Sequence, residues 1–428
     1  MVSEREVRIE YVPLRELLKS LRMDNPKAHD LAAIGASVQR VGFITPVIRN
    51  ERDGRALAGH GRAASLETMR DRGESPPAGI KVAADGEWLV PTVCGVELGA
   101  DDAKAFVIAD NRTSELGGWD EAKLAALTLE LYESEGGLAG VGYDVEDLDH
   151  LLANLLAQID VQAPGPDEAP PIRAANDVYV MPGEIYALGQ HRVACGDSRN
   201  AEFITALLGD RRAHCLVSDA PYGVAYEGGT REKLRIPGDQ AEGLPALLAA
   251  AFAAVDRVLA PGASIYLFHP AGPLSICFEQ AVRDVGWRPR QGLVWLKDQF
   301  VLGRSDYHYR HEPILYAHKA GGGRSGRGST RWHGGNDASS VLEYPRPKAS
   351  HEHPTMKPVV LLESLLRNST VRGEVVIDPF LGSGSTLIAA ERLGRRCFGV
   401  DIDAAFAQVA IERWQAFTGQ RATLEGKT

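Results

Sequence analysis

The sequence predicts an α/β protein in which a parallel sheet with helices on both faces forms the C-terminal part, behind a smaller α+β domain. Three observations lead to this prediction. Strand and helix signals alternate through residues 176–428. A proline-rich stretch over residues 161–175 (VQAPGPDEAPPIRAA) separates this part from the preceding residues. Near the C-terminus a hydrophobic strand runs into a glycine-rich turn, as in many nucleotide-binding sheets.

The chain of 428 residues is longer than one typical domain. Leucines at helical spacing behind an acidic first turn predict a helix over residues 144–159, directly before the proline-rich stretch. We therefore expect four consecutive parts: a first domain (1–110), a helical extension (111–160), a semi-rigid linker (161–175) and a second domain (176–428).

Composition and charge restrict the location of the protein and its partners. No apolar run reaches the roughly 18 residues that a spanning helix needs, and the N-terminus lacks the apolar core of a signal peptide, so we expect a cytoplasmic protein without a membrane partner. The five cysteines are scattered and form no CxxC pair, which argues against a metal site such as zinc and against a disulfide framework.

A net charge of −10 does not favour nucleic-acid binding, so any DNA contact requires a local basic surface. Residues 283–331 could supply it, because they carry many more basic than acidic side chains, with aromatic residues interleaved. A solvated face is the alternative interpretation of such a run. Among the aromatic residues, Trp295 and Tyr316 lie in apolar runs typical of strands, and we expect them in the core.

The elements of the second domain follow in order. A strand beginning at Cys215 ends in a proline turn by Gly223. The stretch LPALLAAAFAAVDRVLAPGA predicts a helix stopped by Pro261 and Gly262, and SIYLFHP predicts a buried strand over residues 264–270. Further on, EVVIDPF, LIAAERLGRR and CFGVDID predict a strand, a helix and a second strand.

The strongest local signal is VVIDPFLGSGST, residues 375–386. A strand ends at Asp378, and the turn after it contains Gly382 and Gly384, which let the backbone approach a ligand beside the free N–H groups of the next helix. Asp401, at the end of the following strand, can accept hydrogen bonds from both ribose hydroxyls of a nucleoside. A tight turn with a purely structural role is the alternative, and the sequence contains no GxxxxGK[ST] P-loop.

The second signal is VSDAPYG, residues 217–223, where a strand ends in a turn forced by Pro221. Chemistry on an exocyclic amine requires acceptors for its two hydrogens. Asp219 can accept one, the backbone carbonyl of Ala220 the other, and Tyr222 can stack on the base. Taken alone, the same residues could form an ordinary turn at the end of a strand.

Both motifs resemble those of DNA methyltransferases that modify amino groups. DPFLGSGST resembles their first motif, and DAPY resembles their (D/N/S)PPY motif with Ala220 in place of the first proline. The order of four motifs is similar to that of the β class, which methylates adenine N6 or cytosine N4: GQHRVACGDS (189–198), DAPY, HPTMKP (353–358) and DPFLGSGST.

The resemblance implies a site-specific, Rossmann-like DNA methyltransferase of restriction–modification type that uses S-adenosyl-L-methionine. It assigns to the cofactor Asp378, Phe380, Gly382, Gly384, Ser385, Asp401, Asp197 and Lys357. It assigns to a flipped base Asp219, Ala220, Pro221 and Tyr222. An aspartate rather than a serine at position 219 favours adenine N6, with cytosine N4 as the alternative.

The target-recognition region of such enzymes corresponds to residues 223–350, which contain the basic stretch. The implied DNA-binding residues are Arg304, Arg310, Arg324, Arg327 and Arg331. No general base is obvious, and His269 and His353 are only weak candidates. An amine activated by hydrogen bonding can transfer first and lose its proton afterwards, so none is required.

The N-terminal domain has a different character. Residues 34–69 predict a helix, a short strand, a hairpin turn at Asp53-Gly54, a second strand and a turn that opens a helix. Gly61 and Arg62 at that helix start form a candidate anion site, and a plain helix-entry turn is the equal alternative. The pattern resembles the ParB/sulfiredoxin-like domain, although Gly59-His60-Gly61-Arg62 matches its motif only in part.

The segment ADNRTSELGGWDEAKL, residues 109–124, resembles the sequence that follows this domain in phage-type modification methylases. The expected partners are double-stranded DNA, a second copy of the chain as a homodimer, and a nucleotide or protein ligand of the first domain. Two rival functions remain: a ParB-like DNA-binding protein or nucleotide switch with an inert methyltransferase half, and a methyltransferase that acts on RNA or protein.

Overall fold

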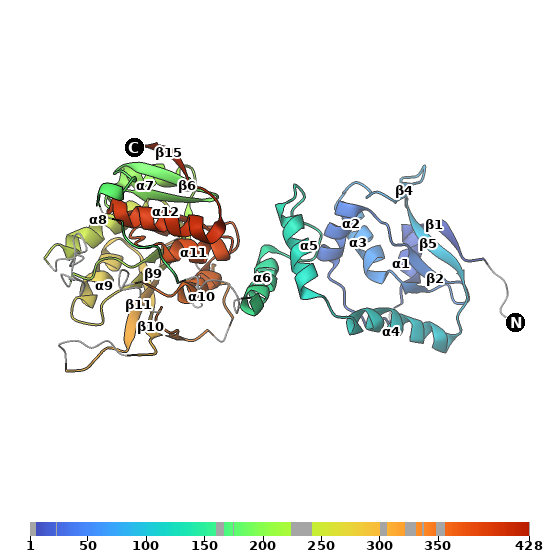
Figure 1. Cartoon of the computed structure of the whole chain (residues 1–428). Helices are drawn as coiled ribbons and strands as arrows, with labels where there is room; N and C mark the ends of the chain where they lie inside the picture. The colour runs from blue at the N-terminus through green and yellow to red at the C-terminus, as the bar shows by residue number, and fades with distance from the viewer. Residues whose placement is uncertain are drawn as a thin grey trace. The chain divides into compact units, whose positions relative to one another are not determined.

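A computed structural model describes residues 6–22, 24–159, 167–173, 175–223, 242–299, 306–321, 331–335, 338–347 and 356–427. The chain divides into two compact units, Met1–Gln158 and Ile159–Thr428 (Figure 1). Among the described residues, no helix is both long and apolar enough to cross a bilayer.

The first unit is built on a small mixed sheet. Its described strands are β1 (Arg8–Pro13), β2 (Val47–Asn50), β3 (Ala56–Ala58), β4 (Lys81–Val82) and β5 (Trp88–Val96). They lie in the order β1-β5-β2-β3, and β4 also pairs with β5. Strand β5 runs antiparallel to β1 and parallel to β2, so this unit is of the α+β type that the sequence predicts.

Three helices cover this sheet: α1 (Leu14–Ser20), α2 (Leu31–Val41) and α3 (His60–Asp71). The core between them contains Leu14, Leu66 and Val90, each fully buried. Asp30 caps α2 by accepting bonds from the N–H groups of Ala32 and Ala33, which explains why the helix begins there. The predicted order over residues 34–69 is confirmed, including the hairpin turn, where Gly54 has a φ of 71°.

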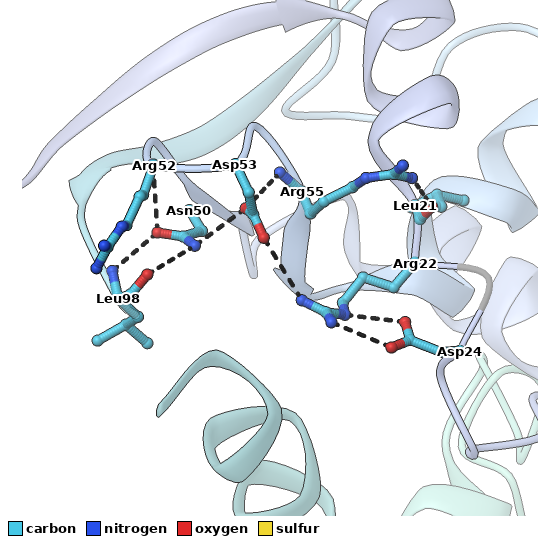
Figure 2. A network of polar contacts seen from close by, with 8 residues as sticks. All are labelled: Leu21, Arg22, Asp24, Asn50, Arg52, Asp53, Arg55 and Leu98. Atoms are coloured by element: carbon cyan, nitrogen blue, oxygen red, sulfur yellow. Dashed lines mark hydrogen bonds and ion pairs between the residues drawn. The ribbon is translucent and has the colours of Figure 1, made fainter. Parts of the chain in front are cut away.

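A polar network ties the β2–β3 hairpin to the end of β5 (Figure 2). Asn50 is only 1% exposed. Its side-chain nitrogen donates to Asp53 at 3.0 Å and to the carbonyl of Leu98 at 3.2 Å, and its side-chain oxygen accepts from the N–H of Leu98 at 2.9 Å. On the other side of the hairpin Arg22 pairs with Asp24 and Asp53. The buried amide therefore has partners for both of its polar atoms.

Helices α4 (Ala100–Leu116), α5 (Glu121–Glu133) and α6 (Val145–Ile159) follow the sheet. The predicted boundary at residue 110 falls inside α4, because no glycine or proline interrupts the helix before Gly117. The predicted closing helix is observed as α6. Of the predicted linker, residues 160–166 and 174 lie outside the described residues, whereas Asp167 and Arg173 bond to residues of the second unit at Val359 and Glu412.

The second unit contains a sheet of 10 described strands. They are β6 (Glu184–Leu188), β7 (His191–Cys195), β8 (Ala213–Ser218), β9 (Leu259–Phe268), β10 (Arg288–Leu296), β11 (His311–His318), β12 (Val341–Glu343), β13 (Val375–Asp378), β14 (Arg396–Asp401) and β15 (Thr423–Lys427). Their order is β12-β10-β11-β9-β8-β13-β14-β7-β6-β15. The five central strands from β9 to β7 are all parallel, which confirms the predicted α/β class.

Helices cover both faces of this sheet (Figure 1). A short 3₁₀ turn, Ala175–Asp177, precedes the first strand. One core is formed with α7 (Ala201–Leu208), α8 (Leu244–Asp256) and α9 (Ser275–Asp284), and the other with α10 (Val359–Ser369), α11 (Ser385–Arg392) and α12 (Ala404–Thr418). Alternation along β8 sends Leu216 into the first core and Val217 into the second, as the period of a strand requires.

The position of β8 next to β13 determines where a ligand can bind. From β8 the chain crosses to β9 on one side, and from β13 it crosses to β14 on the other side. Neighbouring parallel strands whose connections leave in opposite directions form a topological switch point, and ligands of open α/β sheets bind outside the carboxyl ends of such strands. Asp219 directly follows β8 and Asp378 ends β13, so both lie at this point.

One predicted element is wrong in its bounds. The helix expected to run up to Pro261 ends at Asp256, and Pro261 and Gly262 lie within β9. The β8–β9 register shifts between Ala213 and Cys215, and Gly262 has a φ of 74°, so the strand accommodates both residues in a bulge. The core positions expected for Trp295 and Tyr316 are confirmed, with 2% and 5% exposure.

Candidate active site

The turn after β8 carries the acceptor motif. Ser218 and Ala220 on either side of Asp219 are buried, with 0% and 2% exposure, whereas the Asp219 side chain is 29% exposed. Pro221 and the ring of Tyr222 complete the turn, and Tyr222 packs against both hydrophobic cores. Buried flanking residues therefore hold a carboxylate at the carboxyl edge of the sheet.

Asp219 is part of a cluster of charges from four segments. Lys357 donates to one Asp219 oxygen at 2.5 Å, and the single Tyr222 hydroxyl proton is shared between the other Asp219 oxygen, at 2.9 Å, and Glu312. Glu312, at the start of β11, lies 3.0 Å from the Lys357 ammonium and accepts from the Tyr222 hydroxyl at 2.6 Å. Lys297, after β10, donates to the second Glu312 oxygen at 2.8 Å. These contacts join the acceptor motif to two strands and to the HPTMKP segment.

The environment perturbs these groups in different directions. Burial raises the pKa of Asp219, and the nearby Lys357 ammonium only partly offsets this effect. Burial acts in the same sense on Glu312, but two ammonium groups and a hydroxyl overcome it and hold the pKa of Glu312 at about 2. The pKa of Lys357 is raised because two carboxylates outweigh its own burial. Glu312 and Lys357 are therefore firmly ionised, whereas Asp219 titrates above the usual range.

Aromatic side chains line the same edge. The Tyr222 ring meets the Phe278 ring edge-on, with centroids 6.2 Å apart, and the His269 ring lies 5.9 Å from Phe278. The Lys357 ammonium lies 5.1 Å from the centroid of Phe268 and 5.8 Å from that of Tyr222. Aromatic walls next to hydrogen-bond acceptors suit a flat, polar-edged ring such as a nucleobase.

The glycine turn after β13 is organised by Asp378. Its carboxylate is 3% exposed and accepts from the N–H of Phe380 at 3.1 Å and from the Thr386 hydroxyl at 2.6 Å. Burial raises the pKa of Asp378 to about 7. Asp378 therefore shapes the turn from below, and the structure gives it a supporting position rather than an exposed ligand-facing one.

The two glycines of the turn do different things. Gly384 has a φ of 82° and precedes α11, and a Cβ there would lie 3.0 Å from the Ala410 Cβ, so this glycine permits α11 to pack on α12. Gly382 has a φ of 55°, and a Cβ there would meet no described atom within 4 Å. Its N–H donates to the Asp401 carboxylate at 2.8 Å. The space beside Gly382 is therefore open and bordered by an acidic acceptor.

The remaining predicted cofactor residues lie at the same edge, with one exception in role. The N–H of Gly196 bonds to the Asp401 carbonyl, which places the adjacent Asp197 beside the end of β14, where it pairs with Arg199 at 2.6 Å. Ser385, 7% exposed, accepts from Arg413 at 3.2 Å in the first turn of α11. Lys357 bonds to Asp219 and Glu312, so the structure groups it with the base-binding residues and not with the glycine turn.

A nucleoside cofactor fits this donor and acceptor set. Burial raises the pKa of Asp401 to about 6. Each of its carboxylate oxygens accepts one backbone N–H, from Gly382 and from Asp403, and each retains capacity for a hydroxyl donor. Since the glycine turn also leaves open space, the residues present match what a ribose and its base require.

The predicted DNA-binding arginines are only partly described. Arg304, Arg324 and Arg327 lie outside the described residues. Arg310 is exposed and donates to the carbonyl of Lys297, next to the charge cluster. Arg331 pairs with Glu374 at 2.6 Å at the amino end of β13, which is the sheet edge opposite Asp219. We therefore do not retain Arg331 as a DNA contact near the base site, because its charge is compensated and it lies at the wrong edge.

The N-terminal candidate site forms part of a cavity of about 360 Å³ in the first unit. Gly61 and Arg62 lie in the first turn of α3, which has no side-chain cap. His60 is 8% exposed, and its Nε2 atom, like the Nε atom of Arg62, is buried without a hydrogen-bond partner among the described residues. Burial lowers the pKa of both His60 and Arg62.

Sequence reasoning missed Glu312 and Lys297 as parts of the site. Both stand in the basic stretch of residues 283–331, where Glu312 is one of the few acidic residues. A signal did exist: Glu312 directly precedes the apolar run PILYA, and a carboxylate at the edge of a buried strand needs a partner. Which partner it finds depends on strands β10 and β11 pairing across the Lys297–Arg310 bond.

Fold and site define a doubly wound α/β protein with open space beside Gly382 near its switch point and a partly exposed carboxylate, Asp219, at the same edge of the sheet. Comparison with known proteins agrees with this description. Residues 213–412, slightly less than half of the chain, match the family model described as DNA methylase of the N6/N4 type. The resemblance read from the motifs is thereby confirmed at this level, whereas the ParB-like resemblance stays a prediction.

The chain is similar to bacterial type II methyltransferases over part of their length. It is 44% identical over 69 residues to M2.DpnII of Streptococcus pneumoniae, covering 16% of this chain and 26% of that protein. It is 28% identical over 173 residues to M.HpaI of Haemophilus parainfluenzae, covering 37% of this chain and 55% of that protein. The chain thus spans about a quarter to about half of these curated relatives.

Among solved structures, the chain is similar to the putative DNA modification methylase TTHA0409 of Thermus thermophilus in its complex with S-adenosyl-L-methionine. The sequence identity is 26%, the TM-score is 0.41, and the alignment covers 56% of this chain and 99% of that protein.

Proposed function

We propose that the chain is an S-adenosylmethionine-dependent DNA methyltransferase that methylates an exocyclic base amine, with adenine N6 as the first candidate and cytosine N4 as the alternative. The observation that carries the proposal is the position of Asp219. Its carboxylate lies at the switch point between β8 and β13, beside the glycine turn and within a wall of aromatic rings.

The open space at Gly382 and the free capacity of the Asp401 carboxylate support S-adenosylmethionine as the cofactor. Gly382, Phe380 and Asp401 would hold it, with Asp197 at the neighbouring strand end, while Asp378, Gly384 and Ser385 shape the turn beneath it. The bound cofactor supplies an electrophilic methyl group on a sulfonium sulfur. The family assignment adds to the support.

The acceptor motif orients the amine. Asp219 and the carbonyl of Ala220 accept its two N–H hydrogens, so that the nitrogen lone pair points out of the base plane toward the methyl group. The nitrogen uses that pair to form the new C–N bond, the sulfur keeps the electrons of the broken C–S bond, and the nitrogen then loses one proton. Asp219 is the nearest acceptor for this proton, and its raised pKa makes it a better acceptor than an ordinary aspartate.

The choice of adenine rests on the aspartate at position 219, and the choice of DNA rests on the family match. Arg310, at the base-site edge, and Arg304, Arg324 and Arg327, which lie outside the described residues, are the proposed phosphate contacts. A cytoplasmic location and membership of a restriction–modification system accord with this activity and belong to the same proposal.

The test is transfer of a labelled methyl group to duplex DNA, RNA and protein in parallel, followed by digestion of the DNA and mass analysis of its nucleosides. We expect N6-methyladenine in DNA only. The D219A variant should lose activity by about 100- to 1,000-fold while binding cofactor normally, since acceptor loss of this kind costs about 2.7–4 kcal/mol in the transition state. The matched control D210A removes an exposed aspartate that follows α7 and should remain active.

Four outcomes would contradict the proposal or part of it. Full activity of D219A would refute the role of its carboxylate, and N4-methylcytosine would decide for the alternative base. Label appearing in RNA or protein but not in DNA would refute the substrate class. If nothing is labelled, the methyltransferase half is inert, and this result supports the rival function as a nucleotide switch.

A second proposal concerns the first unit: its cavity binds a phosphate-bearing ligand. The uncapped N-terminus of α3 offers N–H donors, the Arg62 guanidinium adds positive charge, and His60 has an unpartnered ring nitrogen among the described residues at the cavity wall. Titration calorimetry of the full chain with inorganic pyrophosphate should show binding that R62A weakens about tenfold or more, as expected for losing a charge-assisted bond. Binding unaffected by R62A would place the anion elsewhere.

A further inference from the structure

The charge cluster around Asp219 is balanced and largely removed from solvent. It contains two carboxylates and two ammonium groups, and the side chains of Glu312, Lys297 and Lys357 are only 12%, 12% and 8% exposed. Such a cluster is expensive to bury unless each charge is paired. Asp219 is the most exposed member, and it is the one placed to meet a substrate.

This pairing leaves lone pairs of the Asp219 carboxylate available for a substrate amine. A carboxylate offers about four lone-pair sites, and within the described contacts Lys357 occupies one, while the Tyr222 hydroxyl, which it shares with Glu312, takes at most one on the other oxygen. An amine N–H can therefore bond to Asp219 without displacing either partner. Lys357 therefore acts on Asp219 as a fixed positive charge and does not block a substrate amine from reaching the carboxylate.

Glu312 weakens the electrostatic effect of the Lys357 ammonium on Asp219. It lies on the other side of the Lys357 ammonium, at 3.0 Å against 2.5 Å for Asp219, so the ammonium is shared between two carboxylates. Glu312 also fixes the Tyr222 hydroxyl at 2.6 Å. Lys297 compensates the second Glu312 oxygen, which allows Glu312 to stay charged in this position.

We propose that Glu312 and Lys357 are opposed positioning residues for the methyl transfer: Lys357 keeps Asp219 anionic, and Glu312 weakens that effect while it anchors Tyr222 against the target base. This inference rests on the proposed function. It extends the site from the acceptor motif to a residue of β11 and a residue of the segment before α10.

The other titratable groups near the cluster do not replace these two. Burial raises the pKa of Asp378, and the charges of Asp219 and Asp401 raise it further. His269 faces Glu312 from the end of β9, and burial lowers its pKa, so it is neutral near pH 7. Tyr222 is held protonated because burial and two carboxylates raise its pKa.

The test changes each charge without changing the shape of the side chain. In E312Q the acceptor loses a negative neighbour, so Asp219 should ionise at lower pH. In K357M it loses its positive partner, so Asp219 should ionise at higher pH. A charge within about 4–6 Å shifts a carboxyl pKa by about 1–3 units, so each variant should move the titration by about one unit or more, in opposite directions.

Two readouts follow this shift. Infrared difference spectroscopy of the full chain, with D219N to assign the band, reports the titration of Asp219 without requiring activity. The acid side of the kcat–pH profile for DNA methylation reports the same group in the working enzyme. E312Q keeps an acceptor oxygen for the Tyr222 hydroxyl but removes the charge that strengthens this bond, so kcat should fall only about fivefold, with cofactor affinity nearly unchanged. E202Q, an exposed charge change on α7, is the matched control and should move neither readout.

The possible outcomes distinguish a failure of the inference about Glu312 and Lys357 from a failure of the proposed methyltransferase function. Opposite shifts of the infrared titration support the inference, whether or not DNA is methylated. If the wild type methylates DNA and both variants lose activity with unshifted profiles, the cluster is only structural and the inference is wrong. Shifts in the same direction refute it as well. If E312Q does not fold, the result for K357M decides alone, because a titration that fails to move upward overturns the role of Lys357.

Discussion

Replacing each glycine of the DPFLGSGST turn by alanine should separate folding from ligand binding. Gly382 and Gly384 both have a positive φ, 55° and 82°, which costs an alanine roughly 1–2 kcal/mol at either position. They differ in what an added Cβ would meet. At Gly384 it would lie 3.0 Å from the Cβ and 3.2 Å from the Cα of Ala410, whereas at Gly382 it would meet no described atom within 4 Å.

The cost of placing an alanine at a positive φ is nearly the same in the two variants. The difference between their free energies of unfolding therefore reports the steric contact at Gly384. Crowding in a packed interior typically costs about 1–3 kcal/mol, and one contact here is with a backbone atom of α12 that cannot rotate away. We therefore expect the free energy of unfolding of G384A to lie about 1–3 kcal/mol below that of G382A. Conversely, G382A should weaken S-adenosylmethionine binding about tenfold or more, because its methyl group enters the proposed ligand space.

Urea denaturation of both variants gives the stability difference, and calorimetric titration with S-adenosylmethionine gives the affinities. The assignment of Gly384 to helix packing is refuted if G384A is as stable as G382A. The assignment of the space beside Gly382 to the cofactor is refuted if G382A binds as tightly as the wild type. A single result with both variants equally impaired in both assays would mean that the turn acts as one unit.

Three further predictions concern buried polar groups. Because burial raises the pKa of Asp378 to about 7, above its unfolded value, the folded chain loses stability as pH rises through that window. D378N should therefore gain stability relative to the wild type by roughly 2–4 kcal/mol between about pH 4 and pH 7 in urea melts, and a pH-independent difference would contradict this. His191, 3% exposed, bonds Glu391 at 2.8 Å and the N–H of Cys397 at 2.9 Å, so H191A should cost about 2–4 kcal/mol in the same assay, and a loss below about 1 kcal/mol would count against the pairing. N50A should lower the stability of the unit Met1–Gln158 by about 1–3 kcal/mol while methyl transfer stays unchanged, and loss of transfer would contradict the independence of the two units.

Much of the fold could be predicted from the sequence, because local patterns are strong where the backbone geometry requires one type of residue. Gly54 in the hairpin turn and the apolar runs of β13 and β14 predict their elements with little ambiguity. The predicted element bounds were wrong where two local sequence signals compete. Pro261 and Gly262 normally end a helix, yet here they stand inside β9, because a bulge in the pairing with β8 accommodates them.

The site was readable to the same extent. Asp219, Tyr222, Gly382 and Asp401 lie in short motifs whose chemistry depends on neighbouring residues in the chain, and the structure brings them to one edge of the sheet. The partners of Asp219 were not readable in this way. Lys357 is 138 residues away in the sequence, and Glu312 is 90 residues from Tyr222, so neither contact leaves a local pattern.

Alone, the sequence determined the α/β class of the C-terminal part, the order of elements over residues 34–69 and the resemblance to N6/N4 DNA methylases, since each depends on spacing within a few turns or strands. Tertiary structure decided which charges surround Asp219, that Asp378 is buried beneath the glycine turn, and that Arg331 pairs with Glu374 at the amino end of β13. These properties depend on burial and on charges a few ångströms apart, and those distances arise only when strands distant in the chain pair in one sheet.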